Sequence, residues 1–330
     1  MATIGAVAKQ AGVSIASVSR VINGTAARAD TEKRVRAAID DLGYQPNSAA
    51  RALKVRQSEQ ICLSFDDLSN PAYVLMTRGV GQTLSSSKYR LILSSAFSSV
   101  EEIVKHLETM GRGFADGLII SPIYSDPRIA ELISQLKMPV VLVGTMPEGV
   151  NVDNVYVDSA AGLDMAIKHL VETGRKNIAF INGPVATNPG RRRKAAFEKS
   201  MKQLNLAFSN SSNLQAEAFT PEAGYRAISE FRDLKNFDAI ICANDQLAAG
   251  AMKFCVEKRV AIPRDIALVG IDNIDLASLL RPTLTSVDLR AEERGQIAAR
   301  LMLERLANPD SPVKKITVQP QLIIRESSVA

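Results

Sequence analysis

The sequence predicts an all-α helix-turn-helix domain at the N-terminus, followed by a larger α/β body made of two lobes. Three observations lead to this fold class. Apolar residues recur at helical spacing through residue 45, and the excess positive charge lies before residue 60. From residue 60 on, short apolar runs alternate with amphipathic helical patterns, which is typical of α/β architecture.

Length and composition indicate a globular protein with more than one domain. The chain has 330 residues, of which 46% are hydrophobic and 23% charged, so disorder is not expected. No apolar run approaches the roughly 18 residues that span a bilayer, and the first residues do not resemble a secretion signal. Three widely separated cysteines, Cys62, Cys242 and Cys255, favour free thiols in a reducing cytoplasm over a disulfide framework.

The net charge of +5 is unevenly distributed. Nine basic and five acidic residues lie within the first 60 positions, so this fifth of the chain carries most of the excess. A module that binds nucleic-acid phosphates needs such a concentration of cations. A charged run is also compatible with an ordinary solvated surface, so charge alone does not decide between the two.

The first two helices are expected over residues 4–11 and 15–22. In the first, apolar side chains recur at i, i+3, i+4 and i+7, and Gly12 suits the left-handed conformation that ends a helix. Ser14 is a favourable N-cap for the second, which Gly24 helps to close. Two short helices joined by a glycine-containing turn form a helix-turn-helix.

A third helix is predicted from a cap at Asp30 or Thr31 to a stop at Gly43. In this arrangement the N-terminal half of the second helix, the part that reaches base edges, exposes Ile15, Ala16, Ser19 and Arg20. A small helical bundle without a nucleic-acid role would show the same periodicity, so that alternative stays open.

An alanine-rich segment follows Pro46 and ends in the apolar Leu53 among the cations Arg51, Lys54 and Arg56. A segment this short does not hold a helix alone, because nucleation is unfavourable. Its alanines would let a symmetry-related copy approach closely. An apolar side chain flanked by cations suits insertion into the minor groove. The alternative is a solvated linker with Leu53 packed on its own domain.

The body alternates strands and helices. Strands are expected at 61–65, 91–93, 118–120, 140–143, 178–181, 239–242 and 266–271, with helices between them, for example at 162–173 and 245–257. So many strands predict two lobes. The chain is expected to cross between them near Val157–Ala160, Thr285–Asp288 and Val318–Gln321.

Polar side chains follow the predicted strands, where ligands bind in open α/β sheets. These residues are Asp66, Asp67, Ser121, Gly144, Thr145, Asn182, Asn244, Asp245, Asp272 and Asn273. Such residues also cap helices, and for Asp245 we favour the cap. Arg191, Arg192 and Arg193 open a helix, where cations oppose the macrodipole, so at least one should have another partner.

Five segments together resemble the LacI/GalR family of bacterial repressors, in the family's order and spacing across the whole chain. They are residues 3–23, 43–54, 67–73, 242–252 and 269–287. The resemblance implies a periplasmic-binding-protein-like effector domain behind the helix-turn-helix. It also implies a homodimer or tetramer on a pseudo-palindromic double-stranded DNA operator. The DNA-binding residues are then expected to be Thr3, Ser14, Ile15, Ala16, Ser17, Ser19, Arg20, Asn23, Leu53 and Lys54.

Within this resemblance, Leu53 is the minor-groove wedge and Lys54 its neighbour in the groove. The apolar Ile15 and Ala16 could touch thymine methyl groups, which would leave Arg20 as the main hydrogen-bonding reader, expected to contact guanine.

The resemblance also implies a small-molecule effector in the cleft between the lobes, for which we expect a sugar or sugar derivative. Together with the strand-end pattern it gives the expected effector contacts as Tyr73, Ser121, Arg193, Phe219, Asn244 and Asp272. Two departures from the family pattern leave the identity of the ligand undetermined. Gly144 stands where several relatives carry an acid, and Ala196 replaces a usual glycine. There is also no tryptophan.

Two other classes are disfavoured. An enzyme is not indicated, because the chain has no GxGxxG, P-loop or GxSxG motif, and its two histidines, His106 and His169, have no partners at metal-ligand spacing. We therefore expect no catalytic residue, metal or cofactor. A plain solute-binding protein would carry an export signal and lack the basic N-terminal domain.

The expected organisation is a DNA-binding domain at 1–45, a hinge helix at 46–57 and an effector-binding and dimerisation domain at 58–330. Lobe one would comprise about 58–158 and 288–318, and lobe two about 159–287 and 319–330. The expected function is a cytoplasmic transcriptional repressor whose operator affinity responds to the effector, with no membrane association.

Overall fold

The computed structural model describes residues 2–22, 24–45, 57–95, 99–208, 212–231 and 234–329. The chain divides into two compact units, Met1–Ser58 and Glu59–Ala330. Residues 46–56 of the predicted hinge helix at 46–57, with Leu53 and Lys54, lie outside the described residues, as does Asn23. No helix in the described ranges combines the length and the apolar character that a bilayer crossing requires.

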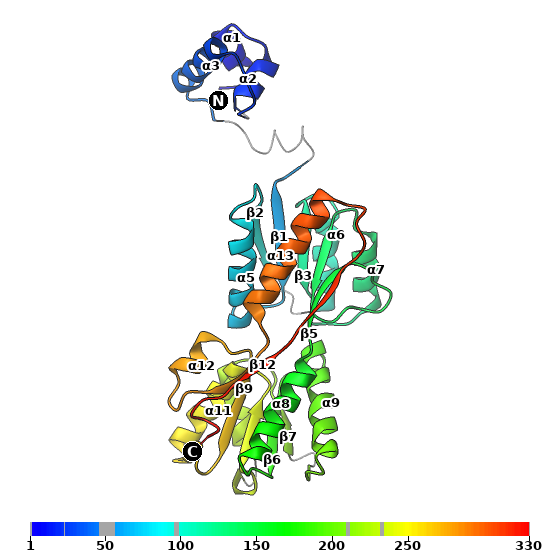
Figure 1. Ribbon diagram of the computed structural model, residues 1–330, viewed down its shortest axis with the longest axis vertical. Helices are drawn as coiled ribbons and strands as arrows, with labels where there is room; N and C mark the ends of the chain where they lie inside the picture. Colours follow the sequence, from blue (N-terminus) through cyan, green and yellow to red (C-terminus); the bar gives the residue numbers. More distant parts are fainter. Residues whose placement is uncertain are drawn as a thin grey trace. The chain divides into compact units, whose positions relative to one another are not determined.

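The first unit is a bundle of three helices, α1 (Ile4–Ala11), α2 (Ile15–Ile22) and α3 (Ala29–Leu42) (Figure 1). Gly12 and Gly43 end α1 and α3 in the left-handed conformation, as predicted. The third helix begins before the predicted cap, because Arg28 occupies the cap position and places Asp30 and Glu32 in the first turn. Acidic side chains there complement the helix dipole.

One core holds this bundle together. It consists of the buried side chains Val7, Ala8, Ala11, Val18, Val21, Val35 and Ala38. These are the positions that helical spacing selects on each helix, so the periodicity of the sequence predicts this core directly.

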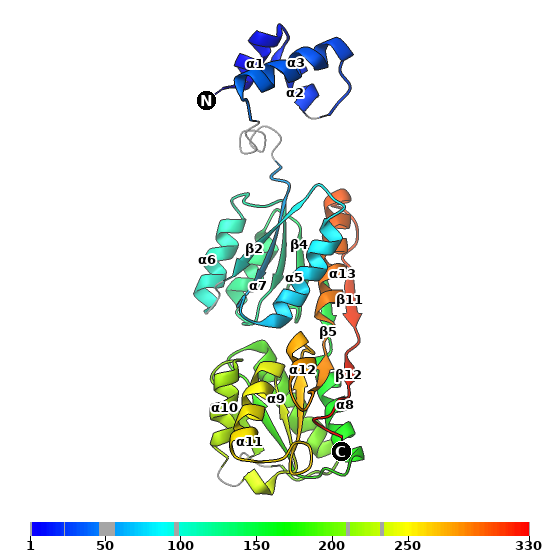
Figure 2. The ribbon, with the colours of Figure 1, turned by 90° about the vertical axis from the view of Figure 1, so that its left-hand side faces the viewer.

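The second unit contains two six-stranded sheets with helices on both faces (Figures 1 and 2). The first sheet has the order β11-β5-β4-β3-β1-β2 and the second the order β12-β10-β9-β8-β6-β7. The strands are β1 (Gln60–Phe65), β2 (Arg90–Ser95), β3 (Gly117–Ser121), β4 (Val140–Val143), β5 (Asp153–Val157), β6 (Ile178–Asn182), β7 (Asn213–Gln215), β8 (Ala239–Cys242), β9 (Ala267–Ile271), β10 (Thr285–Asp288), β11 (Lys315–Val318) and β12 (Gln321–Ile323).

All strand pairs are parallel except β10 with β12. The helices are α5 (Pro71–Leu84), α6 (Val100–Met110), α7 (Pro127–Gln135), α8 (Ser159–Glu172), α9 (Asn188–Gln203), α10 (Pro221–Ser229), α11 (Asp245–Glu257), α12 (Asp275–Leu279) and α13 (Ala291–Ala307), with a 3-10 turn at Leu234–Asn236. The predicted fold class, a helix-turn-helix domain and a two-lobed α/β body, is confirmed.

The chain passes between the two sheets three times. It leaves the first sheet after β5 and enters α8, returns from β10 to α13, and leaves again between β11 and β12. The segment Thr285–Asp288, predicted as a crossing, is itself a strand of the second sheet, and the crossing follows it. We call the half built on the first sheet lobe one and the half built on the second sheet lobe two.

Buried side chains fill each lobe. In lobe one, α5 and α13 cover one face of the sheet, and α6 and α7 cover the other. In lobe two a single cluster joins the sheet to α8, α9, α10 and α11. The three cysteines are buried free thiols within these cores.

Helices α5 and α13 pack backbone against backbone, side by side in Figure 2. A Cβ atom at Gly79 would lie 2.0 Å from the carbonyl oxygen of Glu292, and one at Gly295 would lie 2.3 Å from that of Met76. Only glycine fits at both positions. This close contact fixes the start of α13 beside the middle of α5.

Candidate functional site

The helix-turn-helix is held by side-chain caps at the starts of its helices. The Thr3 hydroxyl accepts from the backbone N–H of Ala6 at 3.2 Å and caps α1. The Ser14 hydroxyl accepts from the backbone N–H of Ser17 at 3.1 Å and pairs with the Ser17 hydroxyl, so Ser14 caps α2 as predicted. Both residues, predicted as DNA contacts, therefore also position the helices in the free protein.

One face of α2 is free of the bundle core. Val18 and Val21 are buried, whereas Ile15, Ala16 and Arg20 are exposed. Ile15 is 49% exposed, so burial in the core does not explain why this residue is apolar. An exposed apolar side chain next to an exposed arginine suits the edges of thymine and guanine in the major groove. Ser17 and Ser19 are half-buried on the flanks of this face.

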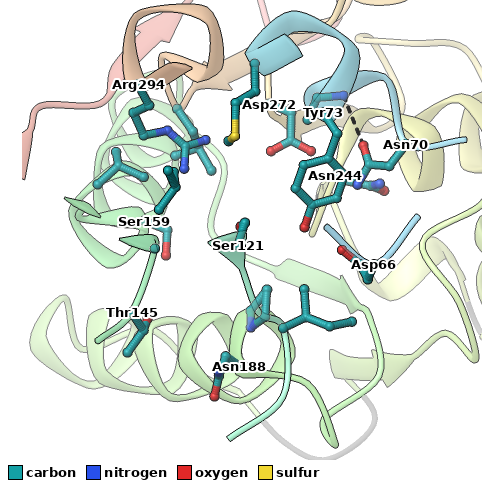
Figure 3. A pocket seen from close by; sticks show the side chains of 18 of the residues that line it. Asp66, Asn70, Tyr73, Ser121, Thr145, Ser159, Asn188, Asn244, Asp272 and Arg294 are labelled. Atoms are coloured by element: carbon teal, nitrogen blue, oxygen red, sulfur yellow. Dashed lines mark hydrogen bonds between the residues drawn. The ribbon is translucent and has the colours of Figure 1, made fainter. Parts of the chain in front are cut away.

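In the second unit, a pocket lies where the two lobes meet (Figure 3). It encloses about 140 Å³ and is formed by the carboxyl ends of strands and the first turns of helices from both lobes. All six residues predicted to contact an effector line it: Tyr73, Ser121, Arg193, Phe219, Asn244 and Asp272. The structure thus brings them together, and their contact with a ligand remains a prediction.

The lobe-one wall is organised around Tyr73. Its ring stacks on Phe65, with centroids 4.7 Å apart and an interplanar angle of 4°. The Asp66 carboxyl and the Ser121 hydroxyl lie near its hydroxyl and act on its pKa. Burial raises the pKa of Tyr73 well above its ordinary value and also raises the pKa of Asp66. The wall therefore offers a fixed ring and a set of hydrogen-bonding oxygens.

The lobe-two wall is built on Arg193 and Asp272. Arg193 is buried, donates from Nη1 to the carbonyl oxygen of Ala243, and lies 3.7 Å through Nη2 from Oδ1 of Asp272. Burial raises the pKa of Asp272, while Arg193 and Arg294 oppose that rise. Asp272 has a φ of +107°, and Asn273 after it has a φ of +51°. Such strain persists only where surrounding contacts enforce it, and it concentrates at functional sites.

Phe219 and Asn244 form the adjoining part of this wall. The Phe219 ring lies directly on Gly183, where a Cβ would come within 2.1 Å of the ring. The Asn244 amide is already engaged: Oδ1 caps α11 by accepting from Leu247 N–H at 2.8 Å, and Nδ2 donates to the Phe219 carbonyl at 3.2 Å. Asn244 therefore positions Phe219 whether or not it also contacts a ligand.

Asp245 has a different role from the predicted helix cap, which Asn244 performs. Its carboxylate accepts from the Ser286 hydroxyl at 2.6 Å and from the Ile274 N–H at 2.8 Å. Asp245 thereby holds the strained turn that carries Asp272. Three further strand-end residues, Asp67, Asn182 and Asn273, are outside the pocket lining.

Several lining residues were not predicted as effector contacts. They are Asp66, Asn70, Thr145, Tyr156, Ser159, Asn188, Arg192 and Arg294. Asp66 and Thr145 belong to the strand-end pattern, which does not separate ligand contacts from caps. Arg294 stands in the first turn of α13, and a cation there opposes the helix dipole. The signal that singled out Arg191–Arg193 would therefore also have found Arg294.

The start of α9 ties the two lobes together beside the pocket. The Asn188 N–H donates to the carbonyl of Ile123 in lobe one at 2.6 Å, and Ser125 donates to Oδ1 of Asn188 at 2.6 Å. Arg191 also donates to that Oδ1, and Arg192 donates to the Tyr156 hydroxyl of β5. Each of the three predicted arginines thus has a partner, and Arg192 makes one of these contacts between the lobes.

Two family models match the chain. The model for bacterial regulatory proteins of the lacI family matches residues 3–47, and the model for the periplasmic binding protein-like domain matches residues 167–328. The HTH-type transcriptional repressor PurR of Haemophilus influenzae (strain PittEE) is 33% identical over 333 residues, covering 99% of this chain and 98% of that protein. The chain belongs to the LacI family. As a LacI-family member it is a DNA-binding transcriptional regulator, and the resemblance drawn from the sequence is confirmed.

Other LacI-family proteins show the same extent of similarity. PurR of Photorhabdus laumondii is 33% identical over 100% of this chain and 97% of that protein. A transcriptional regulator CelR–cellobiose complex matches with a TM-score of 0.74 and 27% identity, over 99% of this chain and 100% of that one. The lac repressor dimer bound to operator and the anti-inducer ONPF matches with a TM-score of 0.89 and 23% identity, over 100% and 99%, and supports the fold.

Proposed function

We propose that this LacI-family protein is a cytoplasmic, homodimeric repressor whose affinity for a pseudo-palindromic operator is set by a small polar effector. The effector, a sugar or sugar derivative, binds in the pocket between the lobes. Residues 1–45 read DNA, 46–57 form the hinge, and 58–330 bind the effector and dimerise. Relatives named as transcriptional repressors, at 33% identity over nearly the whole chain, support the repressor role.

One observation carries the effector part of the proposal. Among the described residues, four buried side-chain polar atoms lack a hydrogen-bond partner, and three of them belong to pocket residues: Asp66 Oδ1, Arg193 Nε and Arg294 Nε. A buried polar atom without a partner costs about 1–3 kcal/mol. A polar ligand that accepts from the arginines and donates to the carboxylate would remove that cost.

Size and shape narrow the ligand further. The pocket volume of about 140 Å³ is close to that of cavities that admit one six-membered ring, about 150 Å³. Phe219 and Tyr73 supply ring faces, and Arg193 and Asp272 supply hydrogen-bonding groups for neighbouring hydroxyls. A pyranose-sized sugar meets these requirements, and the similar CelR structure is described with cellobiose.

The mechanism we propose is a shift between two states. Effector binding changes how the lobes of the two protomers sit against each other, because its contacts come from both lobes. This changes the spacing of the paired hinges and DNA-reading helices in the dimer. The operator affinity then changes by the ratio of effector affinities in the two states.

A thermal-shift screen of the full chain against sugars, sugar phosphates, nucleosides and purines tests the proposal. A true effector at 100 times its dissociation constant should stabilise the protein by about 2.7 kcal/mol. Arg193→Ala should lose this stabilisation and keep its affinity for an operator selected from random-sequence DNA. Lys194→Ala, which removes an exposed cation next along α9, is the matched control and should respond like the wild type. If the effector stabilises Arg193→Ala as much as the wild type, the pocket is not its site.

A further inference from the structure

Arg294 is a cation of lobe one that points into the pocket from the first turn of α13 (Figure 3). It faces the pocket from the side of Ser159, across from Tyr73 and Asn244. The backbone contact between α13 and α5 at Gly79 and Gly295 leaves this turn little freedom to move. Arg294 is therefore presented to the cleft by rigid elements.

The Arg294 guanidinium has no protein partner in the described part of the chain. Its Nε is buried without a hydrogen bond, and no carboxylate there lies within the 4.0 Å of an ion pair. Of the other arginines of α13, Arg305 lies 2.9 Å from Asp153, and Arg300 is exposed to solvent. Arg294 is thus the arginine of this helix that combines a buried Nε with the absence of an ion pair, and it faces the pocket.

The charges around the pocket do not balance. Its described lining contains the carboxyl groups of Asp66 and Asp272 and the guanidinium groups of Arg192, Arg193 and Arg294. Asp272 lies beside Arg193, and Asp66 lies near Tyr73 on the other side of the pocket. Arg192 is exposed and bound to Tyr156. Arg294 is half-buried with a buried Nε; the charge of Asp272, which already lies beside Arg193, attracts it, and Arg294 has no ion pair of its own among the described residues.

A partly buried cation without an ion pair of its own is unfavourable for folding. The same burial makes a carboxylate or phosphate a strong ligand for the guanidinium, because a charge-assisted bidentate contact is little screened there. A neutral sugar would fill the pocket and leave the positive charge uncompensated. The arrangement therefore discriminates between an acidic ligand and its neutral analogue.

We propose that the effector carries an acid group, a carboxylate or a phosphate, and that Arg294 binds it while Arg193 and Asp272 bind the hydroxyl groups of the ring. The ligand class is thus a sugar acid or a sugar phosphate. This inference rests on the proposed function and makes it more specific. Acidic ligands should bind at least 100-fold more tightly than their neutral counterparts.

Matched probes on the full chain test the inference by thermal shift and calorimetry at constant ionic strength. The carboxylate arm compares D-glucuronate and D-galacturonate with D-glucose and D-galactose. The phosphate arm compares glucose 6-phosphate and ribose 5-phosphate with glucose and ribose, and includes inorganic phosphate against chloride. We expect members of one arm to raise the melting temperature of the wild type and to lose at least 100-fold in affinity in Arg294→Met. Arg294→Lys, which keeps the charge, should recover part of that loss.

Two further variants give a readout that needs no ligand. Arg300→Met removes an exposed cation from the same helix, and Arg305→Met removes one with a structural ion pair. Without ligand, Arg294→Met should melt at or above the wild-type temperature, like Arg300→Met, whereas Arg305→Met should melt lower.

Three results would overturn the inference. In the first, neutral sugars stabilise the wild type and Arg294→Met equally, which leaves the proposed function standing. In the second, neither phosphate nor any acidic sugar raises the melting temperature of the wild type above its value in chloride. In the third, Arg294→Met is destabilised as much as Arg305→Met, which would give Arg294 a structural role. The proposed function itself would fail on a different result, in which a ligand stabilises Arg193→Ala as much as the wild type.

Discussion

Asp272 shows how the site is positioned residue by residue. Its positive φ is stabilised by its own N–H bound to the Val287 carbonyl at 2.8 Å and by the Asn273 N–H bound to Ser286 at 3.0 Å. Asp245, buried beneath the turn, accepts from the same Ser286 hydroxyl and from Ile274. A network of buried polar groups thus holds this pocket-lining carboxylate in a strained conformation.

Asp245 gives this network a pH dependence. Burial, with a smaller effect from Asp272, raises the pKa of Asp245 to about 8 in the folded protein. The folded chain therefore keeps a proton that the unfolded chain releases. The stabilisation from protonated Asp245 is complete below the ordinary carboxyl pKa and is lost as the pH rises through 8. The loss amounts to at most about 1.4 kcal/mol per pH unit.

Urea denaturation of the wild type and Asp245→Asn between pH 5.5 and 8.5 tests this dependence. Asparagine can accept from Ile274 N–H and donate to Ser286, so the variant keeps both hydrogen bonds without the charge. The free energy of unfolding of the wild type, minus that of the variant, should fall as the pH rises. Parallel pH profiles would show that Asp245 does not titrate in this range.

The expectation that ligands bind at the carboxyl ends of strands, which we call the strand-end rule, predicted part of the site. It selected Asp66, Ser121, Thr145, Asn244 and Asp272, all of which line the pocket. It did not separate Asn244, which caps a helix, from side chains with free polar atoms, because both functions use the same short polar residues.

Long-range contacts account for what the rule missed. Tyr73 and Phe219 entered only through the family resemblance. Arg294 depends on the return of the chain from lobe two to lobe one, more than 200 residues after Tyr73, which no local pattern records.

At the scale of elements, strands made of apolar runs were predictable and strands with polar or charged residues were not. β1, β3, β4, β8 and β9 are short apolar runs with nearly every residue buried. β5 begins with Asp153, which is buried because Arg305 of α13 binds both of its carboxylate oxygens and Lys314 N–H donates to it. Its partner β11 begins with the exposed Lys315. These strands form through contacts distant in sequence, so their local composition gives little signal.

The exposed face of α2 leads to a prediction about DNA reading. Arg20→Ala removes the longest hydrogen-bonding side chain of that face and leaves Val18 and Val21 in the core. We expect the free energy of operator binding to become less favourable by about 1–3 kcal/mol. The same substitution should cost less binding free energy on DNA that differs at the contacted base pair. Fluorescence anisotropy on the selected operator and on its single-base variants measures both effects.

Arg36→Ala is the matched control for Arg20→Ala. Arg36 lies on α3, is exposed and forms an ion pair with Glu32 one turn away. Removing it deletes the same charge from the first unit at little cost to stability. If both variants lose the same affinity on every DNA, Arg20 contributes only through its charge and α2 does not read bases.

At the scale of the whole molecule, the proposed regulation depends on coupling between two units of one chain. The first unit exposes one face of α2, and the second encloses a pocket whose walls come from both lobes. Contacts of Asn188 and Arg192 with lobe one show that the lobes touch directly beside the pocket. In the proposed mechanism, a ligand there would favour whichever lobe arrangement completes its contacts, and a dimer would transmit that preference to DNA.

The central claim is that DNA binding depends on what occupies the cleft, and linkage tests it most directly. The dissociation constant for operator is measured with and without saturating effector, and that for effector with and without saturating operator, on the full chain. The account predicts that both change by the same factor, about 5–150-fold in either direction, and that Arg193→Ala abolishes the change. An operator affinity that stays the same when the pocket is saturated would contradict it.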